Sequence, residues 1–270
     1  MSEQQAPRGS LVVVGTGIQL VSQMTIEAKA AIEEADKVLY LVADPATRYW
    51  IKKLNSGAES LHHFYEQGKP RIQTYLEMVE KALSYVREGL DVCVALYGHP
   101  GVFVFPSHEM VKRARAEGFQ AKMLPGISAE DCLFADLGID PSMHGCQSFE
   151  ATDFLIHRRT FDTTSSLILW QIGVVGEANY TLTLDTKNLR ILVEHLENFY
   201  DQSHQVAIYE ASPYPTCDPT ILWVALHDVP SSPVTPISTL YVPPKAKACV
   251  DEEMMNRLNY TSPTRASIQR

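Results

Sequence analysis

A glycine- and proline-rich turn that directly follows an apolar run is the feature that most constrains the fold of this 270-residue chain. Residues 92–96 (Val-Cys-Val-Ala-Leu) have the composition of a buried strand, and residues 97–103 (Tyr-Gly-His-Pro-Gly-Val-Phe) follow at once. In open α/β proteins, ligands bind beyond the carboxyl ends of the strands, and glycines there let backbone amides approach a ligand. The alternative is a tight strand-to-helix turn, and this segment alone favours neither interpretation.

Two further turns of the same kind favour a binding site. Residues 11–17 (Leu-Val-Val-Val-Gly-Thr-Gly) and residues 124–129 (Leu-Pro-Gly-Ile-Ser-Ala) each place glycine directly after a short apolar stretch. Three such turns in one chain predict that several strands end at a common ligand-binding edge.

The first half of the chain alternates strand and helix patterns. A strand at residues 11–14, a helix at 25–35 and a β-branched-rich strand at 37–42 form a βαβ unit. A further helix is predicted from about residue 107 to 117, leading through Gly118 to a strand at 122–124.

Between these elements we predict a long amphipathic helix that begins near Pro70 and stops at Gly89. Arg71 and Tyr75 lie one turn apart beside its apolar stripe. That stripe has the spacing of a buried helix face and consists of Ile72, Leu76, Val79, Leu83 and Val86.

The second half is richer in strands. Strands are predicted at residues 166–170, 205–209, 221–225 and 237–242, with one helix at 189–200. A short Pro/Ser segment separates the last two strands and predicts that they pair antiparallel. We therefore expect an α/β protein with a flexible N-terminus (1–10), a mostly parallel N-terminal domain (11–126), a C-terminal domain with a mixed sheet (127–248) and a polar tail (249–270).

Charge and composition exclude several classes of partner. The formal net charge is −9, and no run of Lys and Arg is longer than a pair, so we expect no nucleic-acid partner. No apolar h-region or membrane-spanning run occurs, which predicts a cytoplasmic protein without a membrane partner. The nine histidines and five cysteines show no zinc-binding spacing, so no metal is expected.

Taken together, these segments resemble the tetrapyrrole methylase superfamily, and more closely the borosin-type peptide α-N-methyltransferases. The resemblance covers roughly residues 10 to 245. Its matching segments are 14–17, 63–65 with Arg71 and Tyr75, 96–103, 125–130, 135–141, 147–151, 169–171, 208–211 and 236–240.

Two departures narrow the choice of family. Tetrapyrrole methylases usually carry Gly-x-Gly-Pro-Gly-Asp after the first strand, whereas this chain has Gly-Thr-Gly-Ile-Gln-Leu at residues 15–20. A dinucleotide-binding fold is disfavoured because the third glycine of its motif is absent and Asp44 is a weak candidate for its acidic residue.

The resemblance implies an enzyme that uses S-adenosylmethionine to methylate backbone amide nitrogens of a ribosomally made peptide, repeatedly along the chain. Fused borosins carry an apolar substrate peptide in a long C-terminal extension, whereas the tail here is polar. The expectation is therefore a split arrangement with a separate precursor peptide. The resemblance also implies a homodimer.

The candidate catalytic residues follow from the chemistry of the amide. Its nitrogen is a poor nucleophile because the lone pair is delocalised into the carbonyl. A base for the N–H proton and stabilisation of charge on the amide oxygen would restore reactivity. Tyr65 and Tyr75 are candidates for base and orienting hydroxyl, and Arg71 is the cation that lowers the pKa of a tyrosine or binds the oxygen. Spacing alone favours the interpretation of Tyr75 and Arg71 as surface residues of a helix. The resemblance favours catalytic roles for them instead.

Tyr97 is expected to border both the cofactor and the substrate amide. The cofactor-binding residues that the resemblance implies are Tyr97, His99, Val102, Ser128, Ala129, Gln171, Tyr209, Ala211, Ser238 and Thr239. Residues 62–68 are a candidate for covering the cleft with a partner subunit or peptide, and are otherwise a surface loop.

Two other functions stay open at this stage. One is a small-molecule methyltransferase that acts on a tetrapyrrole or corrin. The other is a catalytically silent protein that docks a peptide.

Overall fold

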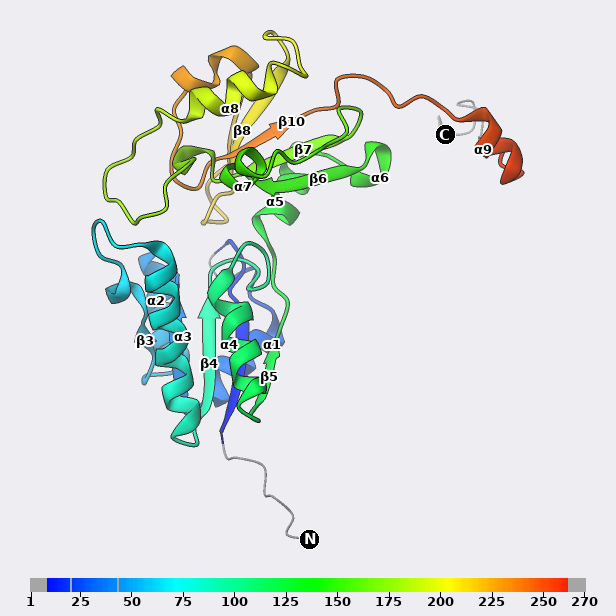
Figure 1. The fold of residues 1–270 in the computed structure, drawn as a ribbon. Helices are drawn as coiled ribbons and strands as arrows, with labels where there is room; N and C mark the ends of the chain where they lie inside the picture. Colours follow the sequence, from blue (N-terminus) through cyan, green and yellow to red (C-terminus); the bar gives the residue numbers. More distant parts are fainter. Residues whose placement is uncertain (1–8, 20, 43, 262–270) are drawn as a thin grey trace.

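Buried apolar strands build two separate sheets in the computed structural model, which describes residues 9–19, 21–42 and 44–261. Figure 1 shows the two sheets in two domains, one above the other, with the N-terminal domain below. The flexible N-terminus expected at residues 1–10 lies almost entirely outside the described residues. The predicted α/β architecture, a parallel sheet followed by a mixed one, is confirmed.

The first sheet is entirely parallel, with the order β3-β2-β4-β1-β5. Its strands are β1 (Ser10–Gly15), β2 (Lys37–Leu41), β3 (Glu59–Ser60), β4 (Asp91–Leu96) and β5 (Gln120–Met123). The βαβ unit is present, but β4 lies between β1 and β2. All five strands therefore end at the edge that faces the second domain, as the β4 arrow shows in Figure 1.

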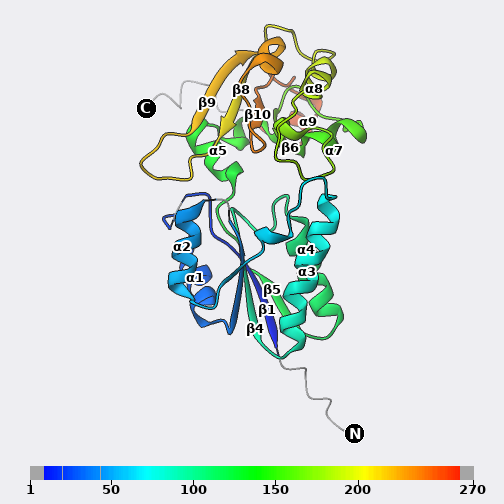
Figure 2. The same ribbon diagram turned by 90° about the vertical axis from the view of Figure 1, so that its left-hand side faces the viewer.

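Helices cover both faces of this sheet, as Figure 2 shows. One face packs against α1 (Ile26–Glu34) and α2 (Pro45–Leu54), and the other against α3 (Arg71–Arg87) and α4 (Phe105–Ala116). Thr25 caps α1 and Asp44 caps α2, each accepting a hydrogen bond from a backbone N–H of the first turn. The central strands β1, β2 and β4 are largely buried on both sides, which explains their continuous apolar runs.

The predicted stripe on α3 is correct from Val79 onward, but Leu76 is only half-buried and the start of the stripe is exposed. Val79, Leu83 and Val86 are fully buried, but Ile72 is 50% exposed. The reason is visible in Figure 1, where the first turn of α3 extends past the sheet toward the second domain.

The second sheet has the order β6-β7-β10-β8-β9, in which β6 and β7 pair parallel and the other pairs are antiparallel. Its strands are β6 (Cys146–Glu150), β7 (Ser166–Trp170), β8 (Gln205–Glu210), β9 (Thr220–Ala225) and β10 (Thr239–Val242). The helices of this half are α5 (Ala129–Leu137), α6 (Pro141–His144), α7 (Ala151–Ile156) and α8 (Leu189–Leu196).

The predicted antiparallel pairing of the last two strands is wrong. β10 lies between β7 and β8, and β9 pairs only with β8, so β8 separates the two. The connection between them is not a tight turn: it contains a 3-10 helix, Leu226–Ser231, whose Leu226 and Val229 are buried in the core. This burial carries the chain across to the middle of the sheet.

The tail begins with a short helix, α9 (Glu252–Arg257), capped by Asp251. No helix within the described ranges is long and apolar enough to cross a membrane. The division into domains at residue 126 remains a prediction.

Candidate functional site

The three glycine-bearing turns meet beyond the carboxyl ends of the parallel strands. Gly17 and Gly98 exchange backbone hydrogen bonds of 3.3 and 3.0 Å between the first and second turns. A Cβ on Gly15 would lie 2.2 Å from the Gly98 carbonyl oxygen, and one on Gly126 would lie 2.9 Å from the same atom. Only glycine permits this close approach. Glycine is therefore required at positions 15 and 126 by packing against the neighbouring turn as well as by the turn conformation.

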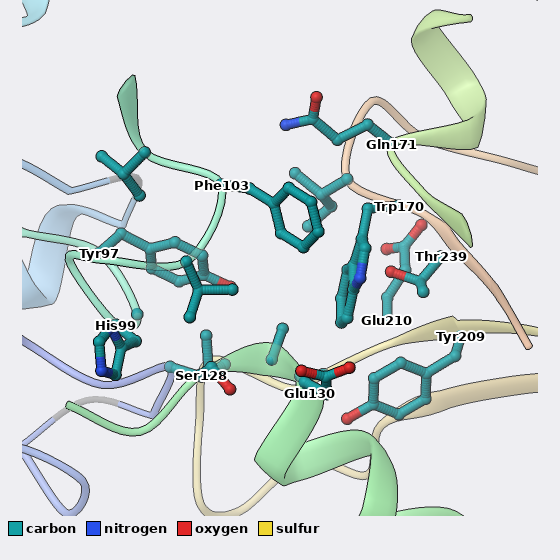
Figure 3. Close-up of a pocket in the computed structure, with 17 residues that line it drawn as sticks. Tyr97, His99, Phe103, Ser128, Glu130, Trp170, Gln171, Tyr209, Glu210 and Thr239 are labelled. Atoms are coloured by element: carbon teal, nitrogen blue, oxygen red, sulfur yellow. The ribbon is translucent and has the colours of Figure 1, made fainter. Parts of the chain in front are cut away.

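A cavity opens between these turns and the second sheet (Figure 3). The space inside it that a water-sized sphere can reach is about 200 Å³, and the cavity is partly open to solvent. Its lining comes from both domains and consists of Ile18, Tyr97, Gly98, His99, Val102, Phe103, Val104, Ser128, Ala129, Glu130, Trp170, Gln171, Tyr209, Glu210, Ala211, Ile237 and Thr239. Nine of the ten predicted cofactor residues are in this set.

The loop after β4 supplies Tyr97, His99 and Val102 to the cavity wall. His99 Nδ1 accepts a hydrogen bond from the Gly101 backbone N–H at 2.9 Å, so the imidazole holds its own turn and leaves Nε2 as the donor. Ser107 of α4 donates to the carbonyl of Pro100, which fixes the loop from behind. Burial raises the pKa of Tyr97 to about 12, and Glu210 adds to this shift.

The third turn passes directly into α5, which starts at the cavity. Ser128 accepts from the backbone N–H of Asp131, and the Asp131 carboxylate accepts from the backbone N–H of Ser128, forming a capping box. This reciprocal pair places Ser128 and Ala129 in the wall and presents the helix N-terminus to it.

The second domain contributes Gln171, Tyr209, Ala211 and Thr239. Gln171 follows β7 with a left-handed backbone (φ 60°), a strained conformation for a residue other than glycine. Tyr209 donates its hydroxyl to Asp136 of α5 at 2.7 Å, and burial together with this carboxylate raises its pKa. Tyr209 therefore offers its ring and backbone to the cavity.

Ser238 is the predicted cofactor residue that does not line the cavity. It is fully buried, and its hydroxyl donates to Glu210 Oε1 at 2.5 Å. Ser238 therefore holds Glu210, which does line the cavity, in place.

Several lining residues were missed by the sequence analysis: Ile18, Gly98, Phe103, Val104, Glu130, Trp170, Glu210 and Ile237. Phe103 and Trp170 come from different domains, and their rings lie 5.9 Å apart. Phe103 also has a left-handed backbone (φ 54°). Most of these residues adjoin predicted ones in the chain, so widening each motif by one position would have found them.

The predicted catalytic residues Tyr65, Arg71 and Tyr75 lie together but do not line this cavity. Tyr75 and Arg71 are both close enough to Tyr65 to affect its pKa. Tyr75 packs against Phe105, just after the lining residues 103 and 104, with ring centroids 6.3 Å apart. The group therefore adjoins the cavity, and Tyr97 is the one predicted catalytic residue in its wall.

Burial outweighs the cation in setting the acidity of Tyr65. Burial and the Tyr75 hydroxyl raise the pKa of Tyr65 above its ordinary value of 10.0, while Arg71 lowers it by a smaller amount. Arg71 does lower the pKa of Tyr65, as the sequence suggested. The net shift of that pKa is nevertheless upward. In this structure Tyr65 is a neutral phenol.

Residues 67–71 form a strap with residues 178–182 of the second domain. Gly68 N–H donates to the Tyr180 carbonyl at 2.9 Å, Tyr180 N–H donates to Lys69 at 2.8 Å, and Arg71 N–H donates to Ala178 at 3.0 Å. The Tyr180 ring lies 4.8 Å from that of Tyr65. In this structure the segment before α3 therefore pairs with its own chain.

S-adenosylmethionine fits the character of this cavity. It has a carboxylate, an ammonium group, a sulfonium and a nucleoside, which call for backbone amides, hydroxyls and small side chains together with negative charge. The wall supplies the α5 N-terminus, Thr239, the small residue Ala211, and the carboxylates of Glu130 and Glu210. Within the described ranges, no cluster of His, Cys, Asp and Glu could hold a metal ion.

The fold and the site define a two-domain α/β protein with a small-molecule cavity between the carboxyl edge of a parallel sheet and a mixed sheet. The sequence matches the family model "Tetrapyrrole (Corrin/Porphyrin) Methylases" over residues 10–215. The chain belongs to this methylase family.

Curated relatives point to a narrower group. The chain is 45% identical over 264 residues to the methyltransferase/ribosomally synthesized cyclic peptide dendrothelin A precursor of Dendrothele bispora, covering 96% of this chain and 63% of the relative. It is 45% identical over 260 residues to the corresponding omphalotin A precursor of Omphalotus olearius, covering 94% and 62%. A type I borosin cyclic peptide precursor of Coprinopsis marcescibilis is 43% identical, with coverage of 93% and 67%. The chain thus spans less than two thirds of the length of the first two relatives.

A solved structure shows the same fold. The uroporphyrin-III-C-methyltransferase from Thermus thermophilus superposes with a TM-score of 0.62 at 17% sequence identity. The match covers 94% of this chain and 98% of that one.

Proposed function

We propose that this protein is an S-adenosylmethionine-dependent methyltransferase that methylates backbone amide nitrogens of a peptide. The observation that carries the proposal is the position of the Tyr65–Arg71–Tyr75 group beside a cavity whose wall contains Tyr97. The names of the relatives support it, since each joins a methyltransferase to a ribosomally synthesized peptide precursor.

When bound in the cavity, S-adenosylmethionine supplies an electrophilic methyl group on a positively charged sulfur. The residues of the chain must make the amide nitrogen nucleophilic and hold it in line with that group, at about 3–3.5 Å. We assign contact with both the cofactor and the amide to Tyr97, and its position in the cavity wall supports this assignment.

We assign roles to Tyr65, Arg71 and Tyr75 from their environment. Tyr65, a neutral phenol, donates a hydrogen bond to the amide oxygen and stabilises the charge that develops there. Arg71 adds its positive charge to the same oxygen. A phenolate at Tyr75, whose own proton has passed to solvent, would accept the N–H proton as the new N–C bond forms and the S–C bond breaks, and would return that proton to solvent before the next turnover.

We propose further that the peptide is a separate molecule. Residues 251–261 include four charged side chains, Asp251, Glu252, Glu253 and Arg257, and all but Met255 are exposed, so this segment differs from the apolar segment that we expect as substrate. Figure 1 shows α9 standing apart from the first domain. The expected homodimer is part of this proposal, and light scattering on the purified protein tests it.

A peptide assay tests the function directly. The protein is incubated with S-adenosylmethionine and a synthetic apolar peptide, and fragmentation mass spectrometry then locates added methyl groups on backbone nitrogens. Tyr75→Phe and Arg71→Ala should abolish turnover and leave cofactor affinity nearly unchanged, because these groups act on the reacting amide. Tyr85→Phe on the same helix is the matched control, because Tyr85 bonds Glu59 away from the cavity, and it should keep full activity.

The outcomes separate the alternatives. No methyl transfer to any peptide, with turnover of a porphyrinoid, would identify a tetrapyrrole methyltransferase. Binding of cofactor and peptide without any turnover would identify a docking protein. Unchanged activity of Tyr75→Phe and Arg71→Ala would remove the catalytic assignment.

A further inference from the structure

The titratable side chains of the cavity wall carry negative charge without a matching cation. Glu130 and Glu210 are both in the wall, and the residues that line it include neither Lys nor Arg. His99 Nδ1 accepts a hydrogen bond from the Gly101 backbone N–H within its own turn. An electrostatic field of this sign favours a ligand with net positive charge.

Glu210 is held in one orientation by its neighbours. Its Oε1 accepts hydrogen bonds from the hydroxyls of Ser238 at 2.5 Å and Thr235 at 2.8 Å. Ser238 is itself fixed, because it is fully buried and its hydroxyl accepts from the Thr235 backbone N–H at 2.7 Å. The turn at residues 235–238 thus serves as a clamp on one carboxylate oxygen.

The second carboxylate oxygen of Glu210 is left for a ligand. No donor in the described part of the chain hydrogen-bonds to Oε2, although the residue lines the cavity. Figure 3 shows Glu210 beside Thr239 and Trp170, across the cavity from Tyr97 and His99. Glu130 differs, because neither of its oxygens accepts a hydrogen bond within the described ranges, so its side chain is not oriented.

Methyl transfer changes the charge of the cofactor. S-adenosylmethionine carries one net positive charge at neutral pH, from its ammonium and sulfonium groups less its carboxylate. S-adenosylhomocysteine has lost the methyl group and is neutral overall, since its sulfur is a thioether. A fixed carboxylate in a partly enclosed cavity distinguishes the two, because the attraction between opposite charges is stronger there than in bulk water.

We propose that Glu210 makes the site prefer the charged methyl donor over its neutral product. This inference rests on the proposed cofactor. It gives the clamp formed by Ser238 and Thr235 a purpose: the carboxylate keeps its place whether the site is empty or filled. It also favours exchange of product for fresh donor, which repeated methylation of one peptide requires.

Isothermal titration calorimetry with both cofactor forms tests the proposal. For Glu210→Gln, a nearly isosteric change, the ratio of the product Kd to the donor Kd should fall about tenfold, since a charge-assisted contact becomes a neutral one. Glu130→Gln removes the unoriented carboxylate of the same wall and should lower this ratio by less than about twofold, because no hydrogen bond holds that carboxylate toward a ligand. Ser238→Ala should lower the ratio of the product Kd to the donor Kd by an amount between those of Glu210→Gln and Glu130→Gln, because it loosens the Glu210 carboxylate without removing its charge.

A second measurement uses the unmodified protein. Raising the salt concentration should weaken binding of the donor and leave binding of the product nearly unchanged. An unchanged ratio in Glu210→Gln, or equal changes in Glu210→Gln and Glu130→Gln, would overturn the assignment of Glu210 and leave the proposed function standing. Failure of the wild-type protein to bind either form would overturn both.

Discussion

Replacing Gly15 with alanine tests whether close contact among the three glycine turns builds the cavity. The added Cβ would lie 2.2 Å from the Gly98 carbonyl oxygen and 2.8 Å from Pro100 Cδ. Ordinary contact begins at 3.4 Å, so the carbonyl would have to move by about 1.2 Å. That movement breaks the hydrogen bond between Gly17 and Gly98 and shifts the loop that carries His99.

The magnitude follows from these two effects. Overpacking costs about 1–3 kcal/mol and the lost hydrogen bond about 1 kcal/mol, so we expect the free energy of unfolding to fall by about 2–4 kcal/mol. In a protein of this size, that corresponds to a fall in Tm of roughly 5–15 °C. The affinity for S-adenosylmethionine should fall as well, because Gly98 and His99 line the cavity.

Thermal unfolding followed by circular dichroism measures the first effect, and calorimetric titration measures the second. Gly57→Ala is the control, because its Cβ would meet only the tip of the Asn55 side chain, at 3.3 Å. Its free energy of unfolding should stay within about 0.5 kcal/mol of wild type. A Gly15→Ala protein with the Tm and cofactor affinity of wild type would refute the reasoning.

Three further predictions concern single side chains. Burial raises the pKa of Tyr97 from 10.0 to about 12, so its contribution to stability is present below pH 10 and lost as the pH rises toward 12; urea unfolding of Tyr97→Phe should show a weaker loss in that range. Burial alone would raise the pKa of Glu59, but hydrogen bonds from Lys37 and Tyr85 lower it to about 2. Stability from Glu59 is therefore present above pH 4.5 and lost as the pH falls toward 2, and Glu59→Gln should flatten acid unfolding there. Ser128→Ala removes one half of the α5 capping box and should lower the free energy of unfolding by about 1 kcal/mol, with Ser128→Thr as the control that keeps the cap; equal stability of the two would contradict the capping role.

Local patterns were sufficient for most of the fold. The three strand-end turns, the α3 stripe from Val79 to Val86 and the strands β7, β8, β9 and β10 follow from residue periodicity and turn chemistry, which depend on near neighbours, whereas β6 was not predicted. The order of the second sheet does not. β10 pairs with both β7 and β8 because a buried 3-10 helix redirects the chain, and no local signal separates that helix from a loop.

The site was predictable to the same extent. Motifs carried by the resemblance reached nine lining residues, since each lies at a strand end or helix start. The small hydroxyl side chain of Ser238 is of a type that often binds ligands, but in the structure this hydroxyl donates a hydrogen bond to Glu210. The pairing of residues 67–71 with 178–182 joins segments more than a hundred residues apart, and it depends on backbone hydrogen bonds that any side chains permit.

The strap at the start of α3 gives the two domains a mechanical connection beside the reactive side chains. Spreading the domains to admit or release a cofactor would pull on the backbone of Arg71 through its bond to Ala178 and would separate Tyr180 from Tyr65. Opening the cavity and disassembling the Tyr65–Arg71 arrangement are then one movement. Under the proposed function, methyl transfer would be confined to the closed form, in which Arg71 and Tyr65 keep this arrangement.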